Sequence, residues 1–207
     1  MPTRLLLLRH GQSTWNAEGR WQGWSDPPLS DLGRAQAAEA AAHLADAGLT
    51  GVVASDLERA RATAGIIAAA LGLGPVVVEA DLREYNVGDW EGLTRSQIEA
   101  GWPEQLGDWR EGRLLATPGG ETRAAFLVRV SAALARVVTS PGLGDTVLVV
   151  IHGGAIRAAE QVTGGERSSV IDNLAGRWFI ADGDGHLRPD DVTFLLGAQR
   201  RTSPPSL

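Results

Sequence analysis

The 207-residue chain contains no cysteine and no lysine, because all 19 of its basic residues are arginine. The absence of cysteine excludes disulfides, thiolate zinc sites and cysteine nucleophiles. The absence of lysine excludes Schiff-base chemistry and the phosphate-binding loop of nucleotide hydrolases, in which a lysine reaches the phosphates. A formal net charge of −6 gives no reason to expect nucleic acid as a partner. An anionic ligand must therefore be bound by a local cluster of arginines.

Long apolar runs are missing as well. The run at residues 5–8 contains four apolar residues, whereas a signal peptide needs about 7 to 15 and a membrane helix about 20. We therefore expect a cytoplasmic protein that does not contact a membrane. The length and the hydrophobic content of 43% suit a single domain over residues 1–197. The proline-containing residues 198–207 predict a disordered tail.

Segments typical of strands alternate with segments typical of helices along the chain. Apolar runs predict strands at residues 4–8, 51–54, 75–78 and 146–151. Helical spacing predicts helices at residues 30–47, 55–71, 121–138 and 153–162, the second opened by a capping box of Ser55 and Glu58. Two further runs at 178–181 and 192–195 predict a closing hairpin. This order predicts a three-layer α/β/α fold with a mostly parallel central sheet.

Residues 88–120 interrupt the alternation. This segment contains Trp90, Trp102 and Trp109 among glycines and charged residues, without a long helical period. We interpret it as an insertion over the sheet edge, where it would form a cap that shapes the substrate site. Its tryptophans could stack on a sugar, although for most of them ordinary core packing is the expected role.

Two of the four histidines, His10 and His152, share a distinctive setting. Each directly follows an apolar strand and precedes a glycine. In open α/β sheets ligands bind at the carboxyl ends of the strands, so both imidazoles should lie at the functional edge. A single histidine in this position would most often only bond to the backbone, but two of them favour a functional role. His43 and His186 are expected to be structural or exposed.

Arginines accompany these histidines. Arg9 precedes His10, and Arg59 lies in the first turn of a predicted helix, where a cation opposes the helix dipole unless an anion is also present. Arg61 should only pair with a nearby carboxylate. Gly153 and Gly154 open another helix, whose free N–H groups favour an anion. Two arginines, two histidines and a helix N-terminus together predict a phosphate pocket, in which the plausible nucleophile is a histidine.

Four sequence blocks resemble those of the histidine phosphatase superfamily, also called the phosphoglycerate mutase-like group. They occur in the family order between residue 4 and about residue 162, and they read LRHGQSTWN at 8–16, SDLERARATA at 55–64, LREYNVGDWEG at 82–92 and IHGG at 151–154. Within the phosphatase branch the blocks are most similar to bacterial broad-specificity phosphatases and glucosyl-3-phosphoglycerate phosphatases, followed by α-ribazole phosphatases. An arginine-histidine-glycine tripeptide alone would be weak evidence, whereas four ordered blocks are specific.

The resemblance implies a role for each matching residue. His10 would be the nucleophile that is transiently phosphorylated. Arg9, Arg59 and His152 would bind the phosphoryl oxygens, with Gly153 beside them. Glu84 would protonate the leaving oxygen and then activate water; Asp89 and Glu91 are rival acids that spacing alone does not exclude. The matching residues that would line the substrate side of the pocket are Asn16 and Gln22.

Nucleophilic attack by a histidine requires a particular protonation state, and this requirement follows from chemistry without the resemblance. A nucleophilic imidazole must be unprotonated at the attacking nitrogen, so a backbone carbonyl should hold the N–H at its other ring nitrogen. Neighbouring guanidinium groups should also disfavour the imidazolium form.

The resemblance predicts a phosphomonoesterase that acts on a small phosphorylated metabolite without metal or cofactor. A phosphoglycerate mutase is the main alternative, but mutases of the family have longer chains and a lysine soon after the acid motif. A catalytically inactive phospho-ligand-binding module and a metal hydrolase are further alternatives. The presence of His10, His152 and Glu84 opposes the first, and the absence of H-x-H and H-E-x-x-H patterns opposes the second. The sequence leaves the substrate open and allows a homodimer.

Overall fold

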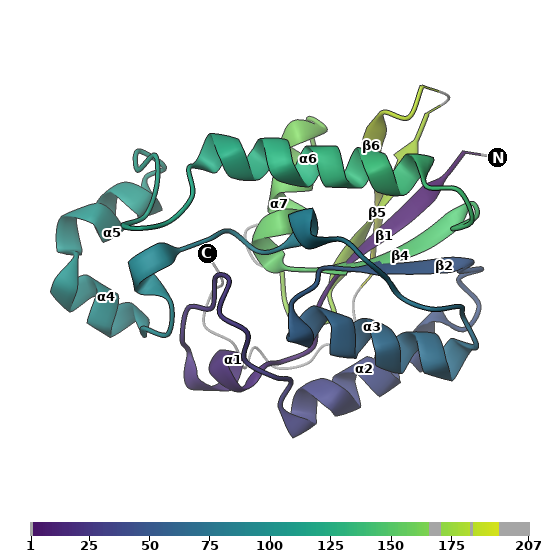
Figure 1. The fold of residues 1–207 in the computed structure, drawn as a ribbon, viewed down its shortest axis with the longest axis horizontal. Helices are drawn as coiled ribbons and strands as arrows, with labels where there is room; N and C mark the ends of the chain where they lie inside the picture. Colours follow the sequence, from purple (N-terminus) through teal and green to yellow (C-terminus); the bar gives the residue numbers. More distant parts are fainter. Residues whose placement is uncertain (1, 166–170, 183, 195–207) are drawn as a thin grey trace.

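The structure is a computed structural model that describes residues 2–165, 171–182 and 184–194 (Figure 1). Its centre is a six-stranded sheet with the order β3-β2-β4-β1-β5-β6. The strands β1, β2, β3 and β4 are parallel, and β5 and β6 close the sheet as an antiparallel hairpin. The strands are β1 (Arg4–Arg9), β2 (Gly51–Ala54), β3 (Val77–Val78), β4 (Thr146–Ile151), β5 (Gly176–Ala181) and β6 (Leu187–Phe194).

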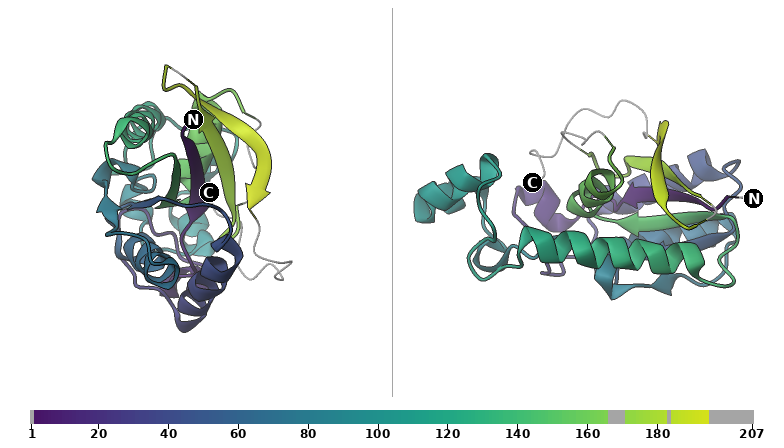
Figure 2. Two further views of the ribbon diagram at one scale, coloured as in Figure 1. Left: turned by 90° about the vertical axis from the view of Figure 1, so that its right-hand side faces the viewer. Right: turned by 90° about the horizontal axis from the view of Figure 1, so that it is seen from above.

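Helices cover both faces of this sheet (Figures 1 and 2). The helices α2 (Asp31–Leu44) and α3 (Glu58–Leu71) pack on one face, and α6 (Arg123–Thr139) and α7 (Gly153–Val162) on the other. A hydrophobic core lies on each face of the sheet, because successive side chains of a strand point to opposite faces. In β1, Leu5 and Leu7 pack on the side of α6 and α7, whereas Leu6 and Leu8 pack on the side of α2 and α3. The predicted three-layer fold with a mostly parallel sheet is confirmed. No helix within the described residues is long and apolar enough to cross a membrane.

Several predicted boundaries are wrong. The last strand, β6, begins at Leu187 and not at residue 192, and α2 ends at Leu44 and not at residue 47. The capping box of Ser55 and Glu58 does not form, since α3 begins at Glu58 with Leu57 as its N-cap residue. The Glu58 N–H instead donates to Asp26 Oδ1 at 2.7 Å, so a carboxylate from a distant loop caps the helix. The strand predicted at 75–78 is reduced to two residues, because only Val77 and Val78 pair with β2 at the edge of the sheet.

The insertion at 88–120 contains more regular structure than its composition predicts. It includes the 3-10 helix η2 (Gly88–Trp90) and the short helices α4 (Arg95–Gly101) and α5 (Pro103–Arg110). Pro103 at the start of α5 and the Thr94–Gln97 capping box of α4 are local start signals that a search for a long period misses. Both helices lie beyond the carboxyl ends of the parallel strands, on the same side as α1 (Thr14–Glu18) (Figure 1).

Most of the insertion's tryptophans serve packing, as expected. Trp90 is fully buried, and its ring centroid lies 5.3 Å from that of Trp21 and 6.2 Å from that of Trp109. Trp102 packs at the edge of the same core. The last predicted strand residue, 195, the tail at 198–207 and Gly183 of the hairpin turn lie outside the described residues.

The loop after β1 is positioned by a close backbone approach between two glycines. A Cβ on Gly11 would lie 2.5 Å from the carbonyl oxygen of Gly33, and a Cβ on Gly33 would overlap the carbonyl oxygen of Gln12. Gly33 also donates its N–H to the N-cap residue Ser30 at 3.0 Å. The start of α2 therefore rests directly on the backbone that follows His10.

We predict that Gly33→Ala lowers the free energy of unfolding by about 1–3 kcal/mol, because the added methyl has no space and the backbone must shift. Urea denaturation measures this loss as a lower midpoint at unchanged slope. Gly65→Ala is the matched control, since Gly65 lies in α3 and a methyl group added there would have nothing within 4 Å. It should gain about 0.5–1 kcal/mol from helix propensity. Equal effects of the two substitutions would show that the backbone contact has no role.

Candidate active site

Segments far apart in the sequence meet at the carboxyl ends of β1, β2 and β4. His10 follows β1, and His152 follows the neighbouring parallel strand β4. Both side chains are buried, and their ring centroids lie 5.2 Å apart with an interplanar angle of 62°. The predicted meeting of the two histidines is thus observed. Strand pairing produces it, because β1 and β4 lie in register and end together.

The surroundings of His10 fix its protonation state. Its Nδ1 lies 2.7 Å from the carbonyl oxygen of Gly11. A carbonyl only accepts, so Nδ1 carries the proton and Nε2 keeps its lone pair. Burial lowers the pKa of His10 well below its ordinary value, and the charges of Arg59 and Arg9 lower it further. The ring is therefore neutral near pH 7, and the expectation that a backbone carbonyl holds it is met.

His152 is held through its opposite nitrogen. Its Nε2 lies 2.9 Å from Ser55 Oγ, the residue that the capping-box prediction had placed at the start of α3. Its Nδ1 is buried and has no hydrogen-bond partner within the described residues. Burial lowers the pKa of His152 well below its ordinary value, with Arg59 and His10 as further causes. A neutral imidazole with one unpartnered nitrogen is suited to contact a polar ligand.

Arg59 lies fully buried beside the two imidazoles. Its Nη1 donates to the carbonyl of Ser25 at 2.8 Å, and its Nη2 donates to the carbonyl of Gly23 at 2.9 Å. Burial lowers its pKa to about 10, although the charges of Glu84 and Asp26 oppose that shift. The guanidinium therefore remains charged at neutral pH. Arg61 lies in the exposed ion pair with Glu58 that its position predicts, at 3.1 Å.

Arg9 is the second buried guanidinium of the site. Its Nη1 donates to the carbonyl of Ile171 at 2.6 Å. Burial lowers its pKa to about 10, Glu84 acts in the opposite direction, and the nearby charge of Arg157 adds to the lowering. Two positive charges are thus held close to two neutral imidazoles. This arrangement favours an anion with several oxygens.

Glu84 lies where α7 begins. Its Oε2 accepts from the Gly154 N–H at 2.9 Å, and its Oε1 accepts from the Tyr85 N–H at 2.8 Å. A Cβ on Gly154 would overlap Oε1, so this contact requires glycine at the start of the helix. Gly153, the first residue of α7, is buried next to His152. The structure therefore brings Glu84 and the Gly153–Gly154 helix start together.

Arg129 of α6 holds the backbone that carries Glu84. Its Nη1 donates to the carbonyls of Asp81 and Arg83 at 2.8 and 3.0 Å, and its Nη2 donates to that of Glu84 at 3.2 Å. The Glu121 carboxylate pairs with this guanidinium at 2.6 Å. One arginine thus fixes the segment whose end presents the Glu84 side chain.

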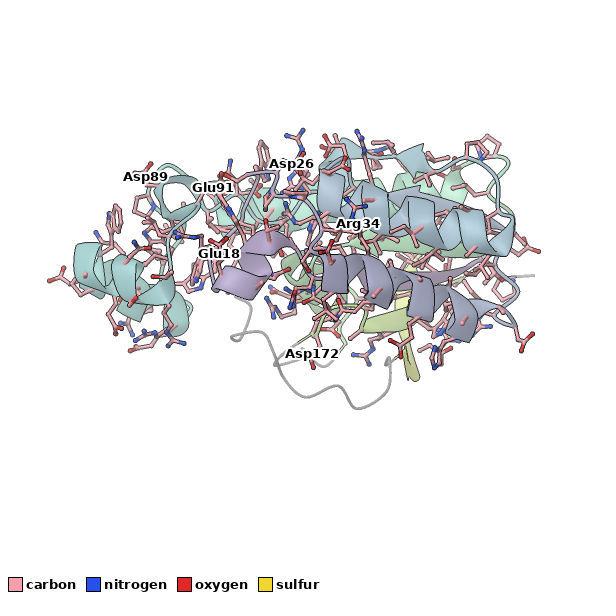
Figure 3. The ribbon with its side chains drawn as sticks, turned by 90° about the horizontal axis from the view of Figure 1, so that it is seen from below. Glu18, Asp26, Arg34, Asp89, Glu91 and Asp172 are labelled. Atoms are coloured by element: carbon pink, nitrogen blue, oxygen red, sulfur yellow. The ribbon has the colours of Figure 1, made fainter. Side chains whose placement is uncertain are left out.

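The rival acids differ sharply in their surroundings. Both oxygens of Glu91 are engaged, one with the Trp24 N–H and one with Ser25 Oγ, each at 2.6 Å. These bonds hold the turn whose carbonyls bind Arg59. Asp89 is exposed on the same segment, toward the end of the molecule formed by α4 and α5 (Figure 3). Neither carboxylate is bonded to a helix N-terminus as Glu84 is.

The side chains of Asn16 and Gln22 both hydrogen-bond to Ser13, in the loop that follows His10. Asn16 Oδ1 accepts from the Ser13 N–H at 3.1 Å, and Gln22 Oε1 accepts from Ser13 Oγ at 2.7 Å. Sequence reasoning missed Asn173, whose Nδ2 donates to the carbonyl of His10 at 2.9 Å. It also missed the role of Ser55. Asn173 lies outside the four matched sequence blocks, and the capping-box spacing of Ser55 predicts a different role, because each residue acts through a contact between distant segments.

Within the part of the chain that the structure describes, no group of residues with metal-ligand spacing lies in this pocket. The one cluster with ligand spacing in that part of the chain is formed by Asp182, Asp184 and His186, and all three are exposed. This cluster lies at the β5–β6 turn. The end of β5 next to that turn pairs with the amino end of β1, where Ile180 lies opposite Arg4. This turn is therefore remote from His10, which follows the other end of β1.

Comparisons with known proteins agree with the geometry. The model of the histidine phosphatase superfamily (branch 1) matches residues 5–172. A glucosyl-3-phosphoglycerate phosphatase of Mycobacterium tuberculosis is 38% identical over 193 residues, covering 84% of this chain and 86% of that one. A 2,3-bisphosphoglycerate-dependent phosphoglycerate mutase of Methylobacterium radiotolerans is 34% identical over 180 residues, covering 84% and 85%. A solved mycobacterial glucosyl-3-phosphoglycerate phosphatase with VO3 has a TM-score of 0.80 at 34% identity, covering 91% and 97%.

The lowered histidine pKa values predict a loss of stability in acid. Between the lowered folded pKa and the ordinary value of 6.5, the unfolded chain binds a proton at each ring that the folded chain does not. The stabilisation is thus present above pH 6.5 and is lost as the pH falls below it. His152→Asn should reduce the slope of unfolding free energy between pH 6 and 5 by up to about 1.4 kcal/mol per pH unit. Urea titrations across that range measure it, and equal slopes would contradict the buried neutral state.

Proposed function

The chain belongs to branch 1 of the histidine phosphatase superfamily, and from this membership and the site we propose that it hydrolyses phosphomonoesters through a phosphohistidine on His10. The observation that carries the proposal is the bond from His10 Nδ1 to the Gly11 carbonyl, which leaves Nε2 unprotonated beside two buried guanidinium groups. A neutral imidazole fixed in this tautomer is a nucleophile that is ready to attack.

The first step transfers the phosphoryl group. Arg9, Arg59 and His152 bind the phosphoryl oxygens, and the N–H of Gly153 at the start of α7 contributes to the same anion site. His10 Nε2 forms a bond to phosphorus while the bond from phosphorus to the ester oxygen breaks. Glu84 gives its proton to that oxygen, so the product leaves as a neutral alcohol.

The second step regenerates the enzyme. Glu84, now a carboxylate, takes a proton from water as the water oxygen attacks phosphorus. The bond between phosphorus and Nε2 breaks, inorganic phosphate leaves, and His10 returns to its neutral form. Charge that develops on the phosphoryl oxygens is stabilised by guanidinium groups already desolvated in the site, so little reorganisation is needed during the reaction. The two steps need only His10, Glu84, water and the groups that bind the phosphate, without metal or cofactor.

For the substrate we propose a phosphorylated sugar or glycerate-type metabolite. The similarity to glucosyl-3-phosphoglycerate phosphatases supports it, since those relatives match most of both chains. Phosphoglycerate mutase is the second candidate, because mutases match at 34% identity. The absence of lysine anywhere in the chain favours hydrolysis, as the family's mutases carry one after the acid motif. Release of inorganic phosphate against isomer formation from 3-phosphoglycerate separates the two.

Rapid quenching with labelled substrate should trap an acid-labile, base-stable phosphate on His10. His10→Ala should abolish both the label and turnover, because it removes the nitrogen that forms the bond to phosphorus. EDTA should leave wild-type turnover unchanged. Label on serine, aspartate or glutamate, or loss of activity in EDTA, would overturn the mechanism.

Glu84→Gln should affect poor leaving groups most, because glutamine keeps the shape but has no proton to give. In single turnover, phosphoryl transfer from an alkyl phosphate should fall about 100-fold more than transfer from p-nitrophenyl phosphate, whose phenolate leaves unaided. Asp89→Asn is the matched control on the same segment and should leave both rates close to wild type. Equal losses for both leaving groups in the Glu84 variant would remove it from the acid role.

A further inference from the structure

Ser55 links the carboxyl ends of the neighbouring strands β2 and β4 (Figure 1). It directly follows β2, and its backbone N–H donates to the carbonyl of Val150 in β4 at 3.1 Å, so the pairing of the two strands continues into this residue. Its hydroxyl lies 2.9 Å from Nε2 of His152, which is two residues beyond Val150. Both side chains are fully buried. The contact therefore lies in a place where a hydrogen bond left unmade is costly.

The direction of this hydrogen bond follows from the other partner of the hydroxyl. Ser55 Oγ accepts from the Leu57 N–H at 3.4 Å. A serine hydroxyl has one hydrogen to donate, and the one acceptor that it reaches in the described part of the chain is His152 Nε2. If Nε2 carried a proton, it would donate to the hydroxyl oxygen, and the buried hydroxyl hydrogen would be left without an acceptor. The hydroxyl therefore donates to Nε2, and the ring proton of His152 lies on Nδ1.

The two imidazoles of the site thus have the same tautomer but present opposite nitrogens. In His10, the Nδ1–H donates to the Gly11 carbonyl, and the bare Nε2 is left for the attack on phosphorus. In His152, the bare Nε2 accepts from Ser55, and the Nδ1–H is left without a partner within the described residues. The carbonyl behind one ring favours a nucleophile, and the hydroxyl behind the other favours a hydrogen-bond donor.

We propose that Ser55 is a positioning residue of the phosphatase reaction, whose hydroxyl holds His152 as a hydrogen-bond donor to a phosphoryl oxygen. The inference rests on the proposed function, because that reaction brings a phosphoryl group to the two rings. In the other tautomer Nδ1 would present a lone pair, and two acceptors would face each other. A donor that is oriented before the substrate binds needs little reorganisation as charge develops on the phosphoryl oxygens.

The position of the ring proton can be measured on the wild-type enzyme. With isotope-labelled histidines, long-range proton–nitrogen correlation spectra near pH 7 distinguish a nitrogen that carries a proton from one that does not. The spectrum of His152→Asn identifies the signals of His152. We expect the proton on Nδ1, and we expect the Nδ1 signal to move when inorganic phosphate binds, because phosphate accepts this hydrogen. A proton on Nε2, or an Nδ1 signal that bound phosphate leaves unchanged, would overturn the proposal.

Ser55→Ala should release the tautomer, so that the two nitrogen signals of His152 approach each other as the proton is shared between them. Inorganic phosphate should bind about 3- to 10-fold more weakly, the scale of one hydrogen bond. The kcat/KM for p-nitrophenyl phosphate should fall by a similar factor.

Thr50→Val is the matched control for this variant. Thr50 directly precedes β2, and its hydroxyl donates at 3.0 Å to the carbonyl of Thr146, the first residue of β4. It therefore links the same two strands at their amino ends, away from the site. The substitution should cost stability but leave the His152 signals, phosphate binding and kcat/KM unchanged. The same changes in both variants would show that Ser55 only supports the strands.

A double-mutant cycle tests whether Ser55 acts through His152. In His152→Asn the side-chain amide takes the place of Nδ1 and can donate to a phosphoryl oxygen, but it is too short to replace Nε2 at Ser55. Ser55→Ala should therefore weaken the binding of inorganic phosphate by less than about 2-fold in this background. An equally large loss in both backgrounds would mean that Ser55 acts by another route, and the proposal would fail.

The outcomes also separate this inference from the function on which it rests. If a phosphohistidine forms on His10 while Ser55→Ala changes neither the His152 signals nor phosphate binding, this inference fails and the phosphatase proposal stands. If no phosphohistidine forms with any substrate, the phosphatase proposal itself fails. Thermal melts identify any variant that does not fold, and the wild-type spectrum tests the tautomer without a substitution at Ser55.

Discussion

The constraint on which the site depends is the burial of two positive charges in one pocket. Burial lowers the pKa of both Arg9 and Arg59 to about 10, so both remain charged at neutral pH in a desolvated setting. Desolvating a charge is costly unless hydrogen bonds and opposite charges compensate. Backbone carbonyls of Gly23, Ser25 and Ile171 and the charge of Glu84 supply part of that compensation. A phosphate dianion would add to it, which favours that ligand over a neutral one.

The same charges determine the state of the histidines. They add to burial in lowering both imidazole pKa values, and the Gly11 carbonyl then selects the tautomer of His10. A neutral His10 is what nucleophilic attack requires, so the groups suited to bind the phosphate also prepare the nucleophile. The cost of burying charge and the reactivity of the imidazole are therefore two consequences of one arrangement.

Periodicity predicted the sheet and the two strand-end histidines, because β1 and β4 are continuous apolar runs whose carboxyl ends meet. The capping-box prediction at Ser55 failed, although the spacing of the motif is present. Ser55 Oγ contacts His152, and the Asp26 carboxylate caps the helix instead. The assignment of Glu84 needed the family resemblance. Glu84, Asp89 and Glu91 are equivalent by local spacing, and only the tertiary contacts of Glu84 with α7 and of Glu91 with the 23–25 turn distinguish them. Asn173 was missed for the same reason.

The insertion and the phosphate pocket are joined at Glu91. This carboxylate lies next to η2, at the base of the insertion, and holds the turn whose carbonyls bind Arg59, while Trp24 of that turn donates through Nε1 to the carbonyl of Glu84 at 2.8 Å. The base of the insertion is thus fixed to the charged centre, whereas α5 lies farther along the chain and takes part in none of these bonds. Side chains there are free to differ without disturbing Arg59 or His10. The bonds that fix the charged centre are therefore separate from the part of the insertion that carries α5.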